Sequence, residues 1–336
     1  MTELLIIILT GVVFFLMGVI PFNKLIFINS SKNIDNYLFN LLSSITLILF
    51  LNIIGLKLSI IITIFYFLLI CSIINCVNYY KLNKIIISSS IPFIIFYGLI
   101  YYIIAISLAY NPSLTWEAQT IWIEKTIPLV FDKTIISLNE TPSPELPILF
   151  PIIWSFFWKF FGASFEYVGR MFILFFYLFA LILFTDLFKI STIKKLIIFL
   201  ILLLTTYRIQ GLQGDLDIII FSIILLSIRS LYIIYNEKKL PQLNNLNFIL
   251  IINLLIWSSN EGMFLSGFLV VVFLLIKKLN INFKSVILLS FVFLLILKLL
   301  IFMHYNFGIN LNSDDYSFGN FNINFDISNL ILISKY

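Results

Sequence analysis

The chain has 336 residues, of which 61% are hydrophobic and only 11% are charged. A soluble domain carries about 25% charged residues, and a soluble globule could not bury this much apolar surface. The composition therefore excludes a soluble protein and a disordered one. The net charge of +5 would suit nucleic acid, but no basic cluster resembles a nucleic-acid groove. We predict an all-α polytopic membrane bundle with no nucleic-acid partner.

The apolar runs predict the membrane crossings, because a helix needs about 20 apolar residues to cross a bilayer. The first run starts at Glu3 without the basic segment or cleavage site of a signal peptide, so we interpret it as a span. The predicted crossings are 3–20, 37–54, 59–77, 85–110, 165–187, 193–207, 217–235, 247–259, 262–276 and 284–303. The run 148–161 has 14 residues and contains Pro151 and Lys159, so it either crosses, lies in the interface or re-enters.

Lysine clusters predict which loops are cytoplasmic. All five fall on one side only if 148–161 does not cross, which favours a re-entrant or interfacial helix there. The clusters are Lys24/Lys32, Lys81/Lys84, Lys189/Lys194/Lys195, Lys238/Lys239 and Lys277/Lys278/Lys284. The predicted organisation is N-terminal transmembrane helices in 1–110, an extracytoplasmic loop in 111–147, a transmembrane core in 148–303 and an extracytoplasmic tail in 304–336. We expect a bacterial inner-membrane protein, and 11 of its 16 acidic residues lie in or beside the outer segments.

The outer loop carries a first candidate motif, Trp-Glu-Ala at 116–118 with Trp122. We predict a short helix over 115–125, capped by Thr115. Helical spacing would place Glu117 and Glu124 on one face. An interfacial helix with a solvated acidic face would explain the same pattern.

Two further motifs follow along the chain. Three prolines between 144 and 151 brace the segment that leads into 148–161, and Glu145 lies among them near the expected membrane surface. In 208–217, two glycines permit a tight turn and Asp215 is well placed to cap the next helix. Capping does not explain Asp217 with Arg208 nearby.

The last motif is the turn at 258–262, where Asn260 can cap a helix and Glu261 would lie at an intramembrane junction. Charged residues in such places are functional candidates, and Lys298, within the final span, could either snorkel or bind an anion. His304 is a lone histidine of the kind that is usually structural. Cys71 and Cys76 would point in different directions on one helix, so we expect neither a disulfide nor a metal site from them.

Together these stretches resemble the GT-C superfamily of integral-membrane glycosyltransferases, which use polyprenyl-phosphate-linked sugars. Its bacterial members carry a Trp-Asp-Ala-x-x-x-Trp-like motif in an outer loop, and residues 116–122 are similar to it. A Pro-rich segment, a Gly-Asp pair and an Asn-Glu-Gly turn follow in the family's order, here at 144–151, 214–215 and 260–262. The resemblance covers roughly 85–305.

The chain departs from the family in three ways. Glu117 replaces the usual Asp, which keeps the chemistry, and Ser259 replaces an expected Lys, which removes a phosphate ligand. The sequence ends at Tyr336, where such enzymes usually continue, so we expect a member that is short at its C-terminus.

The resemblance implies an inverting transfer to an extracytoplasmic glycan or lipid acceptor. Glu117 would take the proton of the acceptor hydroxyl, and Asp215 would orient the acceptor. Cations would neutralise the leaving polyprenyl phosphate. The predicted substrate-binding residues are Glu124, Lys125, Glu145, Arg208, Asp217, Asn260, Glu261 and Lys298. No motif specifies a cofactor, although the acids could hold a divalent metal ion, as in some relatives.

Two other classes stay open. A polysaccharide polymerase or ligase would be expected to have an Arg-rich outer loop, whereas 111–147 has five acids against two lysines. A transporter or flippase predicts inverted repeats and polar residues near mid-membrane, and the sequence indicates neither. Under the glycosyltransferase hypothesis, we expect Glu117, Asp215 and Glu261 to line one outer cavity.

Overall fold

The computed structural model describes residues 2–25, 33–82, 87–110, 113–141, 143–144, 146–162, 164–188, 190–207, 213–214, 216–236, 242–276, 281–305 and 307. The earlier elements are α1 (Thr2–Met17), α2 (Phe22–Leu25), α3 (Asn33–Ile53), α4 (Leu58–Leu82), α5 (Ile87–Tyr110), the π-helix η1 (Ala118–Trp122), α6 (Ile123–Val130) and the short 3-10 helix η2 (Ile135–Glu140). The later elements are α7 (Leu149–Phe161), α8 (Tyr167–Thr185), α9 (Thr192–Thr206), α11 (Asp217–Asn236), α12 (Gln242–Ser258), α13 (Asn260–Leu275) and α14 (Ile281–His304). Every regular element in these residues is a helix, which confirms the all-α prediction.

Among the residues whose side chains are described, five helical segments are long and apolar enough to cross a membrane. They are Glu3–Lys24, Ile34–Ile53, Tyr167–Thr185, Asp217–Asn236 and Ile281–Tyr305, and five further apolar helical stretches within those residues are shorter, two of them the described parts of α4 and α5. These spans agree with an integral membrane protein, while the ten crossings as a set stay a prediction. Several predicted boundaries were wrong: α3 starts at Asn33, not at 37, α4 ends at Leu82, not at 77, and α12 starts at Gln242, not at 247. The turn added to α12 is polar but buried, with Asn244 and Asn245 packed inside the bundle.

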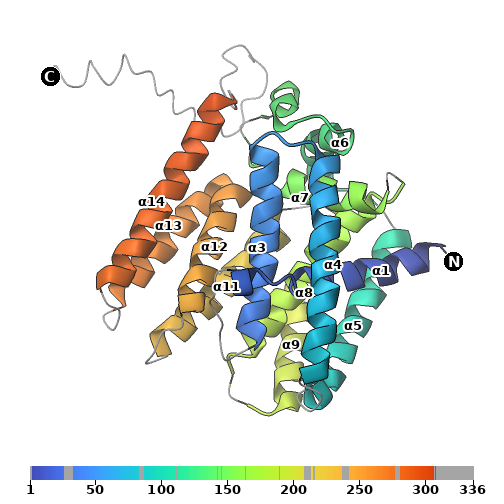
Figure 1. Cartoon of the computed structure of the whole chain (residues 1–336), viewed down its shortest axis with the longest axis vertical. Coiled ribbons are helices and arrows are strands. Elements are labelled where there is room, and N and C mark those ends of the chain that lie inside the picture. The colour runs from blue at the N-terminus through green and yellow to red at the C-terminus, as the bar shows by residue number, and fades with distance from the viewer. Residues whose placement is uncertain are drawn as a thin grey trace.

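Helix α8 forms the centre of the bundle and α14 its edge. The apolar window of α8 is 89% buried, whereas that of α14 is only 17% buried. Figure 1 shows α13 and α14 at one edge, α3 and α12 beside them, and α5 on the far side. Since the outward side chains of α14 are apolar, this edge suits contact with lipid.

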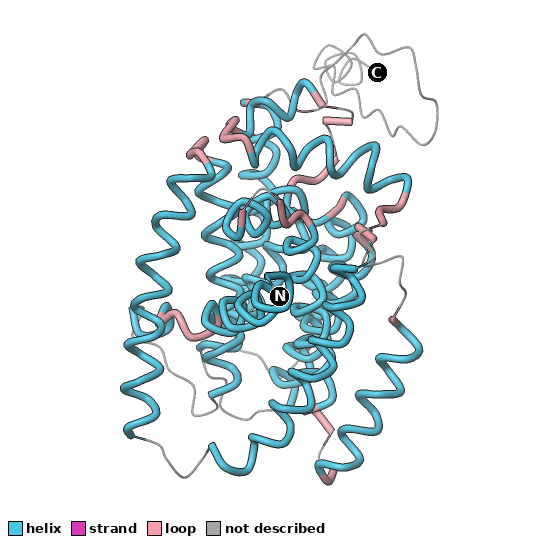
Figure 2. The backbone as a smooth tube through the Cα atoms, turned by 90° about the vertical axis from the view of Figure 1, so that its right-hand side faces the viewer, coloured by secondary structure: helices cyan, strands magenta, loops and turns pink. Residues whose placement is uncertain are grey.

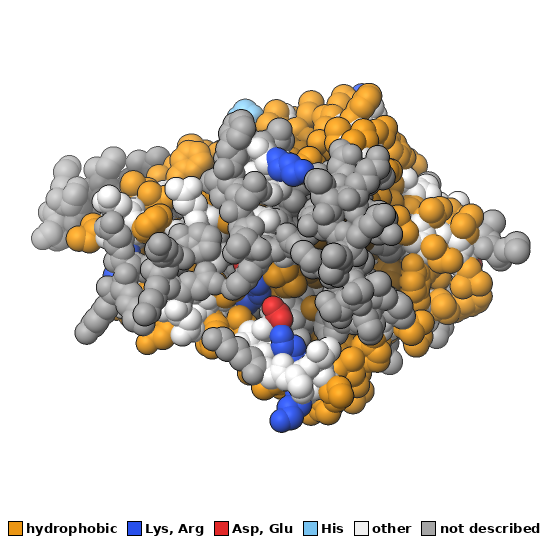
Figure 3. Space-filling view, turned by 60° about the horizontal axis from the view of Figure 1, so that its bottom comes forward, with side chains coloured by type: hydrophobic (Ala, Val, Ile, Leu, Met, Phe, Trp, Pro, Cys, Tyr) orange, Lys and Arg blue, Asp and Glu red, His pale blue; other side chains and the backbone are white. Residues whose placement is uncertain are grey.

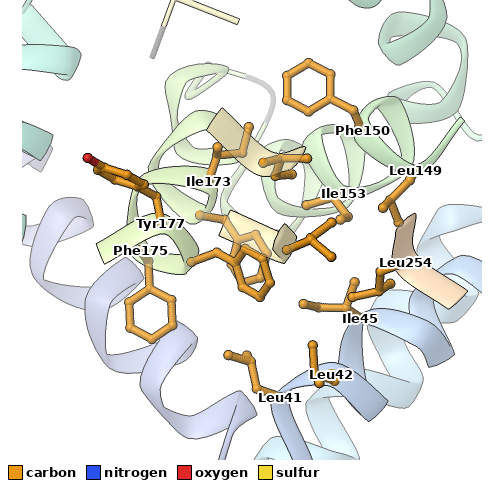
Figure 4. Close-up of a cluster of buried hydrophobic side chains, with 14 of the residues drawn as sticks. Leu41, Leu42, Ile45, Leu149, Phe150, Ile153, Ile173, Phe175, Tyr177 and Leu254 are labelled. Carbon is orange, nitrogen blue, oxygen red and sulfur yellow. The ribbon is translucent and has the colours of Figure 1, made fainter. Parts of the chain in front are cut away.

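The core is built from side chains of α3, α7, α8 and α12, which meet in Figure 4 through residues such as Leu42, Ile153, Ile173 and Leu254. Phe14 of α1 joins this core through aromatic contacts. Its ring lies 4.9 Å from that of Phe157 and 5.2 Å from that of Phe172, both nearly edge to face, the arrangement favoured by aromatic quadrupoles.

Helix α1 runs across the long helices rather than along them. Figure 1 shows it lying crosswise, and Figure 2 views it almost end-on. Its Thr10 hydroxyl shares a hydrogen bond with Tyr101 of α5 (3.0 Å), and Tyr37 of α3 donates to the carbonyl of Phe15 (3.1 Å). Helix α1 therefore links α3 with α5 across the bundle.

Several segments that were predicted to lie outside meet at one end of the bundle, the end with α6 in Figure 1. The Asn139 side chain donates to the carbonyl of Tyr305, which follows α14, and the Tyr305 hydroxyl donates to the carbonyl of Ile53 (2.6 Å). The alternation of crossings and the side of the membrane on which this end lies stay predictions. We call this end the loop end. Figure 3 brings the opposite end forward, where a few charged side chains lie among apolar ones.

Both flanks of α7 contact the loop that precedes it. Lys159, in its last turn, pairs with Asp132 (2.6 Å) and donates to the carbonyl of Val130 (2.8 Å). Asp132 in turn accepts hydrogen bonds from the amide and hydroxyl of Ser59, at 2.9 and 2.7 Å, and so caps α4. After α7 the chain returns to the same loop, where Arg170 of α8 contacts Ser113 (3.1 Å). A helix held in this way at both flanks fits the predicted non-crossing role of 148–161, which stays a prediction.

Candidate functional site

The candidate catalytic carboxylate lies on a helix that contains a π turn. The Thr115 hydroxyl accepts a hydrogen bond from the Ala118 amide (3.2 Å), which confirms Thr115 as the cap. Residues 118–122 then form the π turn. The indole Nε1 of Trp122 donates to Oε1 of Glu117 (3.1 Å), while the Glu117 side chain stays exposed. Since π turns are rare and occur often at functional sites, this local geometry marks Glu117.

The π turn also corrects the predicted stacking of Glu117 and Glu124 on one helical face. The stacking assumed α-helical spacing, whereas i→i+5 bonding brings Trp122 back to Glu117 instead. Glu124 is exposed in the first turn of α6. The adjacent Lys125 is fully buried, donates to the carbonyl of Leu146 (3.0 Å) and lies 6.0 Å from the centre of the Trp122 ring. Lys125 therefore anchors α6 to the Pro-rich segment.

The segment that precedes α11 contacts the segment that carries Glu117. The Thr115 amide donates to the carbonyl of Gln213 (3.0 Å), and the Gln213 side chain donates to the Ser113 hydroxyl (2.9 Å). Gly214 follows with φ of +103°, and a Cβ there would lie 2.5 Å from the Cβ of Ala118. Only glycine fits this backbone and this approach. The structure thus joins two motifs that are about 100 residues apart.

Three of the predicted site residues fall outside the described part of the chain: Glu145, Arg208 and Asp215. Asp217 is described and is exposed as the first residue of α11. Because Gln213 and Gly214 contact the Glu117 segment, the start of α11 is tethered to it.

The turn between α12 and α13 differs from its prediction. Ser259, not Asn260, is the N-cap of α13, and its hydroxyl accepts from the Gly262 amide (2.7 Å). Asn260 and Glu261 are exposed in the first turn of α13. Asn260 fails to cap because it already belongs to the helix. Whether Glu261 shares a cavity with Glu117 stays a prediction.

Lys298 does not snorkel, contrary to one of the two predicted alternatives. It is 4% exposed, and its ammonium donates to the carbonyl of Ile256 (2.7 Å). The rings of Trp257 and Phe302 lie 5.9 and 5.4 Å from it. The cation therefore satisfies a carbonyl in the last turn of α12 between two aromatic faces, as the helix dipole favours, and this describes an inter-helix tie better than a substrate ligand.

Sequence reasoning missed two buried arginines. Arg170, in the first turn of α8, forms a two-point ion pair with Glu166. Arg229 of α11 pairs with Asp35 of α3 (2.6 Å), with side chains only 4% and 1% exposed. A Glu-x-x-x-Arg spacing at the start of a span could have indicated the first pair. No local signal indicates the second, which joins residues 194 apart.

The Asp35–Arg229 pair belongs to a group of buried polar side chains inside the bundle. Asn247 donates to the carbonyl of Asp35 (3.3 Å), and Asn253 lies buried further along α12. Long apolar runs predict helices, and a single polar residue inside such a run does not change that prediction. The bundle interior therefore contains charged and amide side chains between α3, α11 and α12.

At the loop end, the carboxylate of Glu117 is exposed, and the segment that carries it contacts the segment that precedes α11. An exposed carboxylate suits general-base chemistry on a hydroxyl. Among the residues described, no three His, Cys, Asp or Glu side chains gather as metal ligands would. No protein-family model, curated protein sequence or solved structure matches this chain, so the family resemblance rests on the motifs themselves.

Proposed function

We propose that the chain is an integral-membrane glycosyltransferase that moves a sugar from a polyprenyl-phosphate donor to an acceptor on the loop-end side of the membrane. One observation carries the proposal: the Trp-Glu-Ala segment and the Gly-Asp segment, which the GT-C resemblance makes parts of one active site, are in direct contact through Thr115 and Gln213. Local sequence rules do not require this contact.

In the proposed reaction, Glu117 accepts the proton of the acceptor hydroxyl while the hydroxyl oxygen attacks C1 of the donor sugar. The bond from C1 to the phosphate oxygen breaks, and polyprenyl phosphate leaves with that electron pair. The configuration at C1 inverts. Glu117 is exposed, and the hydrogen bond from Trp122 holds one of its oxygens while the other remains for the hydroxyl proton. Asp215 is proposed to orient the acceptor.

The phosphate of the donor needs a cationic side chain to bind it. The contacts that each candidate cation already makes decide which one we propose. Lys125 and Lys298 are both buried and donate to backbone carbonyls. Arg208 precedes the Gln213 turn in sequence, so we propose it as the phosphate ligand. The polyprenyl chain would lie along the apolar outer surface of the bundle, where membrane lipid also binds.

A donor comparison tests this function. Purified protein in lipid vesicles is given a radiolabelled sugar linked to polyprenyl monophosphate, or the same sugar linked to polyprenyl pyrophosphate. The proposal expects release of polyprenyl monophosphate and labelled product from the first donor only. Turnover of the pyrophosphate-linked donor alone would favour the polymerase or ligase class.

A transporter is the second candidate, because the Asp35–Arg229 pair and the buried asparagines of α12 provide the intramembrane polar groups that transport requires. The pair is closed to solutes in this conformation, since both side chains are almost fully buried. Movement of a lipid-linked sugar between the leaflets without cleavage, abolished by Arg229→Met, would favour this class.

A further inference from the structure

Arg170 lies close to the contact between the segment that carries Glu117 and the segment that precedes α11. Its side chain is 0% exposed, in the first turn of α8. The guanidinium donates through Nε to Oε1 of Glu166 (3.0 Å) and through Nη2 to Oε2 (2.7 Å). Such a two-point pair fixes the plane of the guanidinium, which a lysine could not do.

The guanidinium reaches from this pair to the loop. Its Nη1 donates to the carbonyl of Ser113 (3.1 Å), four residues before Glu117. The hydroxyl of the same Ser113 accepts from the side chain of Gln213 (2.9 Å). A single loop residue therefore receives one hydrogen bond from α8 and one from the segment that precedes α11.

Trp154 of α7 packs against both the Arg170–Glu166 pair and the turn at Gly214. Its ring centre lies 6.0 Å from Cζ of Arg170, and its Nε1 donates to the carbonyl of Glu166 (3.3 Å). The far edge of the ring would lie 3.2 Å from a Cβ at Gly214. Trp154 thus contacts both the ion pair and the turn that Ser113 holds.

We propose that Arg170, oriented by Glu166, is a positioning residue that holds the 113–117 loop against Gln213 and so sets the place of the Glu117 carboxylate. The role in catalysis rests on the proposed function. The role in holding the loop does not. Arg170 acts through Ser113, and no substrate contact is assigned to it.

The alternative is a purely structural role, in which the Arg170–Glu166 pair only stabilises the fold. Arg229 provides a matched control, because it is an arginine of similar burial with its own acidic partner. It lies twelve residues beyond Asp217 on α11, roughly 18 Å along the helix at 1.5 Å per residue. A general loss of stability would follow from either arginine, whereas a change in the loop would follow only from Arg170.

Cysteine cross-linking measures the loop contact directly. Ser113→Cys and Gln213→Cys are combined in a chain with Cys71→Ser and Cys76→Ser, and the protein in vesicles is oxidised with copper phenanthroline. Loss of free thiols is followed by a maleimide–polyethylene glycol gel shift. The same chain is prepared with Arg170→Met, Arg170→Lys or Arg229→Met.

We expect Arg170→Met to slow cross-linking about tenfold, the change that loss of one charge-assisted hydrogen bond typically produces. Arg170→Lys should lie between, and Arg229→Met should match the parent. If Arg170→Met does not fold, Arg170→Lys decides alone. Parent-like cross-linking in the Arg170 variants, or equal slowing by Arg229→Met, would overturn the proposal.

Activity separates this proposal from the proposed function. In the chain with Ser113 and Gln213 intact, Arg170→Lys should lower kcat for glycosyl transfer with little change in KM for the donor. If cross-linking responds as expected but no variant transfers sugar, the proposed function fails and the positioning of the loop stands. If Glu117→Gln is inactive but the Arg170 variants cross-link at the parent rate, the positioning role fails and the proposed function stands.

Discussion

At the loop end, Arg170 and Glu166 pair within one helix and extend to a loop, whereas away from that end Asp35 and Arg229 pair between two helices. The first pair leaves Glu166 partly exposed, with a side chain that is 20% accessible, and the second is almost completely sealed. The first pair also contacts Ser113, four residues before the exposed carboxylate of Glu117.

This difference distinguishes an ion pair that contacts the candidate site from one that only joins two helices. A sealed ion pair between helices gives packing specificity at a desolvation cost, and nothing polar can reach it without opening the bundle. An ion pair that reaches an exposed loop can position groups that meet a substrate.

The sealed pair should matter for stability and not for chemistry. Removing one partner leaves a buried charge, so Arg229→Met should lower the free energy of unfolding by about 3–5 kcal/mol. Thermal unfolding in detergent micelles measures the change. The double variant Asp35→Leu/Arg229→Met should recover most of the loss, because neither charge remains. A double variant as unstable as the single one would show that the pair does more than compensate charge.

The contact between the two site segments should be sensitive to one methyl group. Gly214→Ala adds a Cβ 2.5 Å from Ala118 at a positive φ, so the turn must move away from the Glu117 segment. A displacement of about 1 Å near reacting groups can cost about 100-fold in rate, and we expect a loss of this size in glycosyl transfer.

Gly98→Ala in α5 is the matched control, because a Cβ at Gly98 meets nothing within 4 Å. It should leave transfer unchanged and slightly favour the helix. Transfer at the parent rate by Gly214→Ala would contradict a functional contact between the two segments.

The sequence was sufficient to predict helices but not their partners. The run at 217–235 predicts α11 almost to the residue, because apolar length alone decides the extent of such a helix. The cap at Thr115 was also predictable, since it depends on residues three apart. The pairing of Asp35 with Arg229 was not, because local patterns carry no information about contacts between distant helices.

The π turn shows a second limit of the sequence. The spacing of Glu117 and Glu124 assumed 3.6 residues per turn, and the tertiary contact of Ala118 with Gly214 lies where the helix departs from that spacing. Arg170 was overlooked for a related reason. It lies at the start of a long apolar run, where its role depends on Ser113, 57 residues earlier.

The pair of Asp132 and Lys159 should give a small, pH-dependent effect. Partial burial raises the pKa of Asp132, but hydrogen bonds from Lys159 and Ser59 outweigh it and lower that pKa below its ordinary value. Ionised Asp132 therefore stabilises the fold above pH about 4, the ordinary aspartate pKa, and this contribution is lost as the pH falls through the lowered value.

Asp132→Asn removes this contribution and retains the positive φ of +61°, which asparagine tolerates. Because the pair is partly solvated, the expected loss at neutral pH is about 0.2–1 kcal/mol. Unfolding midpoints measured from pH 7 down to pH 3 should fall less steeply for the variant than for the parent. Parallel curves would mean that Asp132 does not contribute to the acid sensitivity.

The central claim is that Glu117 is the base of a glycosyl transfer at the loop end, and a pair of isosteric variants tests it most directly. Initial rates of transfer from a polyprenyl-monophosphate sugar are measured in vesicles for the parent, Glu117→Gln and Glu124→Gln. Loss of a positioned base costs about 10²–10⁴-fold, so Glu117→Gln should lose that much activity while it still folds and inserts, and Glu124→Gln should stay near the parent rate. Parent-like transfer by Glu117→Gln, with Glu124→Gln inactive, would contradict the account.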